Sequence, residues 1–193
     1  MSVGTARARK GGDMPTLSEP RQLFLYKLGD VLTAEKTIVQ MLPRLQQEAK
    51  DDNLSQGFKK HLDQSRKHVE NVEKVFREFG AQPEARPSPV IEGIKKEHDQ
   101  SVGEVSPKVA DLFAAGAATA SEHYEIASYE GLITMAKALG KPQAARLLET
   151  NMKQDQKMLT ETKAIVRRLS NKAAKQSSGG SRRAARPKQT TRR

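Results

Sequence analysis

Four ionisable side chains stand where the sequence pattern calls for apolar core residues. Glu35 interrupts VLTAEKTIVQML, residues 31–42, whose apolar residues recur at helical spacing. His68, Glu122 and Asp155 interrupt three further stripes of this kind, each of them apolar at both ends. An isolated ionised carboxylate in a dry core costs several kcal/mol, so these side chains require a compensating charge.

A divalent metal ion, or a pair of them, would supply that charge. If the four stripes belong to antiparallel helices of similar length, their midpoints lie at the same level, and the four side chains converge. Carboxylate oxygen and imidazole nitrogen, in a chain without cysteine, favour iron or manganese, with zinc as an alternative. Taken singly, a buried carboxylate more often pairs with Lys or Arg, and a core histidine more often packs without a metal. The metal hypothesis depends on the fact that all four helical stripes carry such a residue near the middle.

The elements that must position these residues are helices. Gly80 and Gly140 are typical residues just after a helix end, and Pro142 suits a first helical turn. Ser18 is a candidate N-cap, and Pro43 predicts a kink or a break. The pattern predicts long helices over about residues 19–50, 55–79, 107–139 and 142–170, with a short helix over 90–102.

These helices predict an all-α fold, an antiparallel four-helix bundle over residues 17–170 with a short extra helix between its second and third long helices. An aromatic content of only 4% argues against a β-sandwich. The absence of cysteine excludes a disulfide framework and fits a reducing cytoplasm. No stretch approaches the roughly 20 apolar residues that span a bilayer, and we identify no secretory signal.

The net charge of +11 is concentrated at the ends of the chain. Residues 1–16 are expected to be flexible, and residues 171–193, with eight basic residues and no acidic one, to form a disordered basic tail. Such a tail can bind DNA non-specifically through phosphates, or another polyanion such as RNA or anionic lipid, or can simply be solvated. The residues that would contact nucleic acid are Arg182, Arg183, Arg186, Lys188, Arg192 and Arg193.

Three segments carry a family resemblance: YKLGDVLTAEKTIVQMLPRL, HLDQSRKHVENVEKVF and SEHYEIASYEGLITMAKALG. Together they resemble the YciE/YciF-type proteins, a ferritin-like family known as a domain of unknown function, over about residues 20–168. The resemblance implies a ferritin-like bundle, often dimeric, with a di-iron-type carboxylate site and a role in stress. Glu35, His68 and Glu122 match the positions of family ligands, Glu125 follows in the same segment, and Asp155 stands where the family usually has Glu.

The sequence departs from a complete dimetal set at two places. Gln64 and Ser65 stand where a carboxylate is expected one turn before His68, and Met158 and Leu159 stand one turn after Asp155. One metal ion, a weakly held pair and an empty polar core are therefore all open. Substitutes are available on the predicted short helix, namely Glu92, Glu97 and His98.

Two functions follow as expectations. The first is a cytoplasmic or nucleoid-associated, homodimeric metal-binding protein that oxidises Fe(II) with O₂ or peroxide in stress protection and holds DNA non-specifically through its tail. Ferritin-like proteins that coat DNA carry such tails. The alternative is a non-enzymatic helical protein for DNA binding or dimerisation, in which the metal site is degenerate. The incomplete ligand set leaves the enzymatic activity open.

Overall fold

The computed structural model describes the backbone of residues 17–184 and the side chains of residues 17–176. Within this range the secondary structure is entirely helical, which confirms the predicted all-α class. The five helices are α1 Pro20–Glu48, α2 Asp52–Glu78, α3 Pro89–Ser101, α4 Ala110–Ala138 and α5 Pro142–Ala184.

The two predicted glycine helix ends are confirmed. Gly80 and Gly140 have φ of 64° and 69°, in the left-handed region that glycine adopts without strain. After α2, the amide of Ala81 donates to the carbonyl of Phe76, and the amide of Gly80 donates to that of Arg77. The same pair of bonds closes α4, so both ends are Schellman motifs.

The first two helices differ in detail from those expected. α1 begins at Pro20 after Glu19, and it continues through Pro43 without a break. α2 begins three residues earlier than expected, because Asp51 caps it by accepting a hydrogen bond from the amide of Leu54 at 3.1 Å.

The largest difference is at the end of α5, which continues to Ala184 instead of ending near Ser170. The predicted end near Ser170 is wrong, and residues 171–184 of the predicted disordered tail belong to this helix. Residues 172–176 are all Lys, Ala or Gln, which have high helix propensity and favour its continuation past Ser170.

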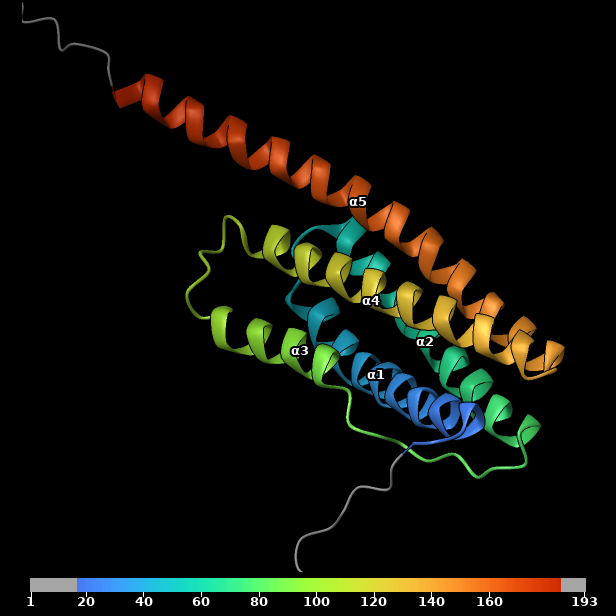
Figure 1. The fold of residues 1–193 in the computed structure, drawn as a ribbon. Helices are drawn as coiled ribbons and strands as arrows, with labels where there is room; N and C mark the ends of the chain where they lie inside the picture. The colour runs from blue at the N-terminus through green and yellow to red at the C-terminus, as the bar shows by residue number, and fades with distance from the viewer. Residues whose placement is uncertain (1–16, 185–193) are drawn as a thin grey trace, which may run out of the picture.

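The long helices form two antiparallel hairpins, α1 with α2 and α4 with α5 (Figure 1). The connection after α2 and the helix α3 run back along the bundle, so α4 starts at the same end as α2 and runs parallel to it. One long crossover of this kind is the arrangement of ferritin-like bundles. A connection that runs along the bundle is what the sequence pattern allows when residues 90–102 form a helix, as they do in α3.

Gly29 lets the long connection lie against α1. Its carbonyl accepts a hydrogen bond from the amide of Arg86 at 3.0 Å. A Cβ atom at this position would lie 2.5 Å from the carbonyl oxygen of Glu84 and 2.6 Å from Cγ of Arg86. Only glycine therefore permits this approach of the two backbones.

The core consists of two apolar clusters separated along the bundle by polar residues. One contains Phe24, Leu28, Phe76 and Leu148 near the α2–α3 connection. The other is built around Ile38, Leu42, Phe58, Leu62 and Ile91. Glu35, His68, Glu122, Glu125 and Asp155 lie along their helices between residues of these two clusters and so share one layer near the middle of the bundle. His61 lies between Phe58 and Leu62 of the second cluster.

Candidate metal centre

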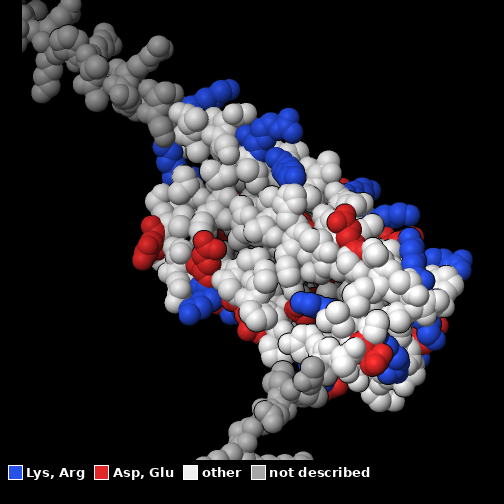
Figure 2. Space-filling model, in the orientation of Figure 1, with Lys and Arg blue, Asp and Glu red and all other residues white. Residues whose placement is uncertain are grey.

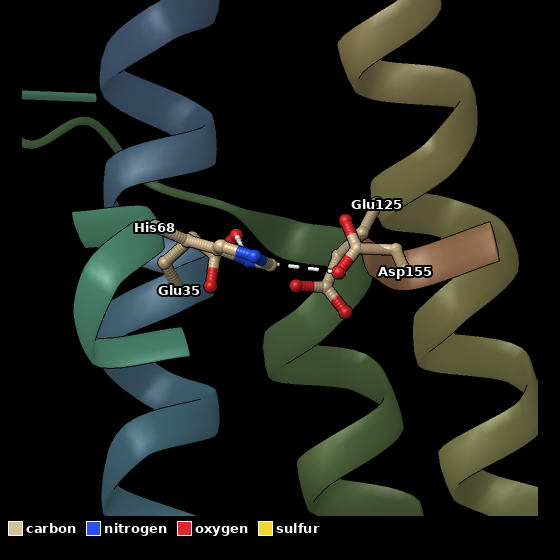
Figure 3. Close-up of side chains that lie close together, drawn as sticks. All are labelled: Glu35, His68, Glu125 and Asp155. Atoms are coloured by element: carbon tan, nitrogen blue, oxygen red, sulfur yellow. Dashed lines mark hydrogen bonds and ion pairs between the residues drawn. The ribbon is translucent and has the colours of Figure 1, made fainter. Parts of the chain in front are cut away.

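One group of potential ligands takes one residue from each long helix: Glu35 from α1, His68 from α2, Glu125 from α4 and Asp155 from α5. All four are at most 1% exposed. They point toward one another in the bundle interior (Figure 3), and one donor atom from each lies within 4.8 Å of the others. Such a cluster of carboxylates and imidazole can hold a metal ion.

A second group adjoins the first and shares Glu125 with it. Its members are His61, Glu122 and Glu125, again with one donor atom each within 4.8 Å of the others. Glu122 and Glu125 are three residues apart on α4, and neighbours at this spacing lie on one face of a helix. Nδ1 of His61 lies 3.3 Å from Oε1 of Glu122.

His61 is the member that the sequence analysis did not identify as a ligand. It precedes His68 by seven residues, or about two helical turns, which places the two imidazoles on the same face of α2. That spacing was the available signal.

The other residues at the incomplete ligand positions, and the suggested substitutes on α3, lie outside both groups. Ser65 and Met158 are buried, and neither belongs to the two groups of potential ligands. Of the suggested substitutes on α3, Glu92 and Glu97 are exposed. His98 is buried and stacks on the ring of Phe113. None of these three is in either group.

Hydrogen bonds from neighbouring residues orient the first group. Nδ1 of His68 lies 3.1 Å from Oε1 of Glu35, and its Nε2 lies 3.0 Å from Oε1 of Gln154. The hydroxyl of Tyr129 donates to Oε1 of Glu35. Asn151 in turn donates to that hydroxyl at 3.0 Å and to the carbonyl of His68 at 3.3 Å. Outer partners of this kind fix the orientation of ligands in metal sites.

Within the described part of the chain, several buried oxygen and nitrogen atoms of the cluster have no hydrogen-bond partner. They include both carboxylate oxygens of Glu122 and of Glu125, Oε2 of Glu35, Oδ2 of Asp155 and Nε2 of His61. Buried polar atoms in proteins are nearly always hydrogen-bonded. A concentration of unpartnered oxygen and nitrogen atoms in one layer therefore fits a bound cation better than it fits a purely structural core.

Burial dominates the protonation of the carboxyl groups. It raises the pKa of Glu122 to about 10 and that of Asp155 to about 8, with the charge of Glu35 adding to both shifts. Burial, followed by the charges of Glu35 and Asp155, also raises the pKa of Glu125 well above its usual value. Without a metal, the folded protein therefore keeps the carboxyl of Glu122 protonated at neutral pH, and burial favours the protonated form of Glu125 as well.

The two histidines titrate in opposite directions. Burial lowers the pKa of His61 to about 4, so its imidazole is neutral and available to a metal at neutral pH. Burial would lower the pKa of His68 as well, but the carboxylates of Glu35 and Asp155 raise it to about 9. In the metal-free protein, His68 is thus the cation that balances part of the carboxylate charge.

The predicted nucleic-acid contacts lie at the edge of the described chain. Arg182 and Arg183 belong to the last turn of α5, beyond the described side chains, and Arg186, Lys188, Arg192 and Arg193 lie outside the described residues. Among residues 17–184, the structure contains no helix that is both long and apolar enough to cross a membrane.

Comparison with known proteins agrees with this architecture. Protein YciF of Escherichia coli K12 is 30% identical over 135 residues, which cover 69% of this chain and 81% of that protein. The crystal structure of the E. coli stress protein YciF superposes with a TM-score of 0.76 at 28% identity, covering 81% of this chain and 99% of that one. The structure of YcfI from Rhodopseudomonas palustris gives a TM-score of 0.76 at 33% identity, with 79% and 98% coverage.

The family described as "Domain of unknown function (DUF892)" matches residues 19–175, nearly the whole of the bundle. That match, the identity to YciF and the shared fold lead to one conclusion: this chain belongs to the YciE/YciF-type family.

Proposed function

We propose that this chain binds two divalent metal ions in the middle of its bundle, with iron as the physiological metal. The observation that carries this proposal is the pair of buried ligand groups that share Glu125. Four buried carboxylates, those of Glu35, Glu122, Glu125 and Asp155, would together balance the charge of two divalent cations. The ligands lack sulfur, which favours iron or manganese over softer metals, and zinc is the remaining alternative.

The chain's own residues divide between the two positions. Glu35, His68 and Asp155 would hold one ion, His61 and Glu122 would hold the other, and Glu125 would contribute an oxygen to each. Tyr129 and Asn151 keep Glu35 and the backbone of His68 in place. Loading would displace protons from the carboxyls and from His68, since ligands bind a metal in their deprotonated form.

Fe(II) held by these residues would be open to oxidation by O₂ or peroxide. The relative YciF is described as a stress protein of E. coli. By extension, we propose that this chain consumes iron and oxidant together and so protects a stressed cell. The apolar clusters on both sides of the polar layer restrict the access of bulk water to it.

Metal stoichiometry tests the proposal. The chain, stripped with a chelator, is titrated under anaerobic conditions with Fe(II), Mn(II) or Zn(II), and two ions per chain are expected. Glu125→Gln should reduce this number, because it changes the ligand common to both positions. Glu130→Gln is the matched control, since it makes the same change on an exposed position of α4. Fewer than one ion per chain would refute metal binding.

Oxidation is tested separately on the loaded protein. We expect Fe(II) to be oxidised by O₂ or peroxide faster in the presence of the protein than in buffer, and more slowly with Glu125→Gln than with Glu130→Gln. If two ions bind but oxidation matches the rate in buffer, the site stores or senses metal and the enzymatic part of the proposal fails.

A second candidate function is non-specific binding of DNA by the C-terminal part of the chain. Figure 2 shows Lys and Arg side chains gathered along the edge of the molecule occupied by α5. Arg167, Arg168 and Lys172 lie on this helix ahead of the basic residues 182–193. Basic side chains spaced along one helix can neutralise several phosphates without reading the base sequence.

Replacement of the six basic residues between 182 and 193 by Gln tests this function at constant chain length. Retention on duplex DNA at low salt should weaken, and the dependence of affinity on salt should become shallower, since fewer counterions are released. Unchanged retention would show that the tail is not the binding element.

We also propose that the chain forms a homodimer in the cytoplasm or nucleoid. Sedimentation should then give twice the chain mass of 21.3 kDa.

A further inference from the structure

A pocket of about 360 Å³ lies between α2, α4 and α5, next to the metal centre. Its walls include Leu54, Phe58, Ala118 and Ile165. His61 and Met158, which are only 4% and 3% exposed, also line it. The pocket therefore joins the outside of the molecule to one member of the second ligand group and to no other member of either group.

The chemistry of the pocket is unsuited to a hydrated cation. Most of the exposed wall surface is apolar, although Asn53, Gln56 and Thr162 also line it, and apolar surface cannot replace the water shell of a metal ion. At the rim, Nζ of Lys60 contacts the two carboxylate oxygens of Glu161 at 2.7 and 2.6 Å, and the pair joins α2 to α5. Because these two opposite charges satisfy each other, the rim presents no net charge to attract an ion.

We propose that this pocket admits small uncharged molecules, of the class of O₂ and hydrogen peroxide, to the His61 side of the cluster. The identification of the molecule as an oxidant rests on the proposed function, whereas the access route itself does not. Nε2 of His61 is buried and has no hydrogen-bond partner among the described residues, so it is the polar atom that an entering molecule would find free.

Gly57 keeps the pocket open. It lies on α2 among the lining residues, and a Cβ atom there would meet only Cδ1 of Ile165, at an ordinary 3.8 Å. Alanine therefore fits without strain and narrows the pocket slightly. Leucine extends from the same point into the open volume and should close it.

The test uses diethyl pyrocarbonate, a small uncharged reagent that acylates imidazole, on the metal-free full-length chain. Peptide mass spectrometry follows His61 and, as an internal reference in the same molecules, the exposed His123. We expect Gly57→Ala to slow the labelling of His61 modestly. Gly57→Leu should slow it on the order of tenfold, since a close-packed interior admits reagents only when it opens locally.

Gly131→Leu is the matched control, because it adds the same side chain to α4 where a Cβ atom would have no neighbour within 4 Å. It should leave the labelling of His61 at the native rate. Two results would overturn the proposal: no labelling of His61 in the native chain, or equal rates in the native chain and in Gly57→Leu. The second would assign access to the smaller cavity of about 30 Å³ beneath α3, which also borders His61.

Metal binding by the same variants separates this proposal from the proposed function. At equilibrium, Gly57→Leu should bind as many ions as the native chain, but its iron should be oxidised more slowly. A chain that binds no metal yet shows slower His61 labelling in Gly57→Leu would refute the proposed function and leave the access route standing. Normal metal binding, with the same rate of His61 labelling in Gly57→Leu as in the native chain, would refute the access route and leave the proposed function standing.

Discussion

Replacement of Glu122 by Gln should change how the stability of the metal-free protein depends on pH. Burial, together with the charges of Asp155 and Glu35, raises the pKa of this carboxyl from 4.5 to about 10. The folded state therefore holds a proton that the unfolded chain releases above pH 4.5. A group of this kind stabilises most below pH 4.5, and its contribution is lost as the pH rises toward 10. Gln is uncharged at every pH and removes this dependence.

The magnitude follows from the shift in pKa. Within this window, each pH unit lowers the free energy of unfolding by about 1.4 kcal/mol through one such group. At pH 7 the accumulated loss from Glu122 is about 3 kcal/mol, a large fraction of the stability of an ordinary domain. Metal-free Glu122→Gln should therefore be more stable than the native chain at pH 7, and its advantage should grow with pH.

Urea unfolding in the presence of a chelator, at intervals from pH 5 to pH 8, measures this difference. Other buried groups titrate in both proteins, so the free-energy difference between the two curves isolates the effect of position 122. Glu130→Gln is the control, since it removes a carboxylate from an exposed site on the same helix. Parallel curves for native protein and Glu122→Gln would refute the claim that this carboxyl is buried uncompensated.

The remaining predictions concern metal binding and packing. Metal at 100 times its dissociation constant should raise the free energy of unfolding by about 2.7 kcal/mol per site. Metal binding should also release protons from the ligands, which calorimetry in buffers of different ionisation enthalpy should detect. Gly29→Ala should lower the free energy of unfolding in urea by about 1–3 kcal/mol, because its Cβ would lie 2.5 Å from the carbonyl oxygen of Glu84; an unchanged value would mean that the connection does not press on α1. Arg168→Ala should lower it by less than about 1 kcal/mol, although Arg168 forms two short bonds to Asp51, because its side chain is 42% exposed.

Helix ends were predictable from the sequence where a single residue type determines the local backbone. Gly80 and Gly140 end α2 and α4 as expected, since few other residues adopt positive φ without strain. The end of α5 was not predictable in the same way. Basic composition suggested disorder, but Ala, Lys and Gln also favour a helix, so composition supported both outcomes.

Part of the candidate site was also predictable. The apolar stripes interrupted at Glu35, His68 and Asp155 predicted one polar layer, because helical periodicity determines which face of each helix is buried. The same periodicity left α2 ambiguous, since His61 and Leu62 both suited the buried stripe. The rotation of α2 against its neighbours decides between them, and in the structure both are buried, with His61 reaching Glu122.

By itself, the sequence determined that four amphipathic helices carry ionisable residues at similar depth, because helical spacing is a local property of the chain. Tertiary structure alone decided that Glu125 belongs to both ligand groups and that His61 completes the second one. It also decided that the connection crossing Gly29 makes α4 run parallel to α2. These features depend on the rotation and register of helices distant in sequence, which are set when all the helices pack together.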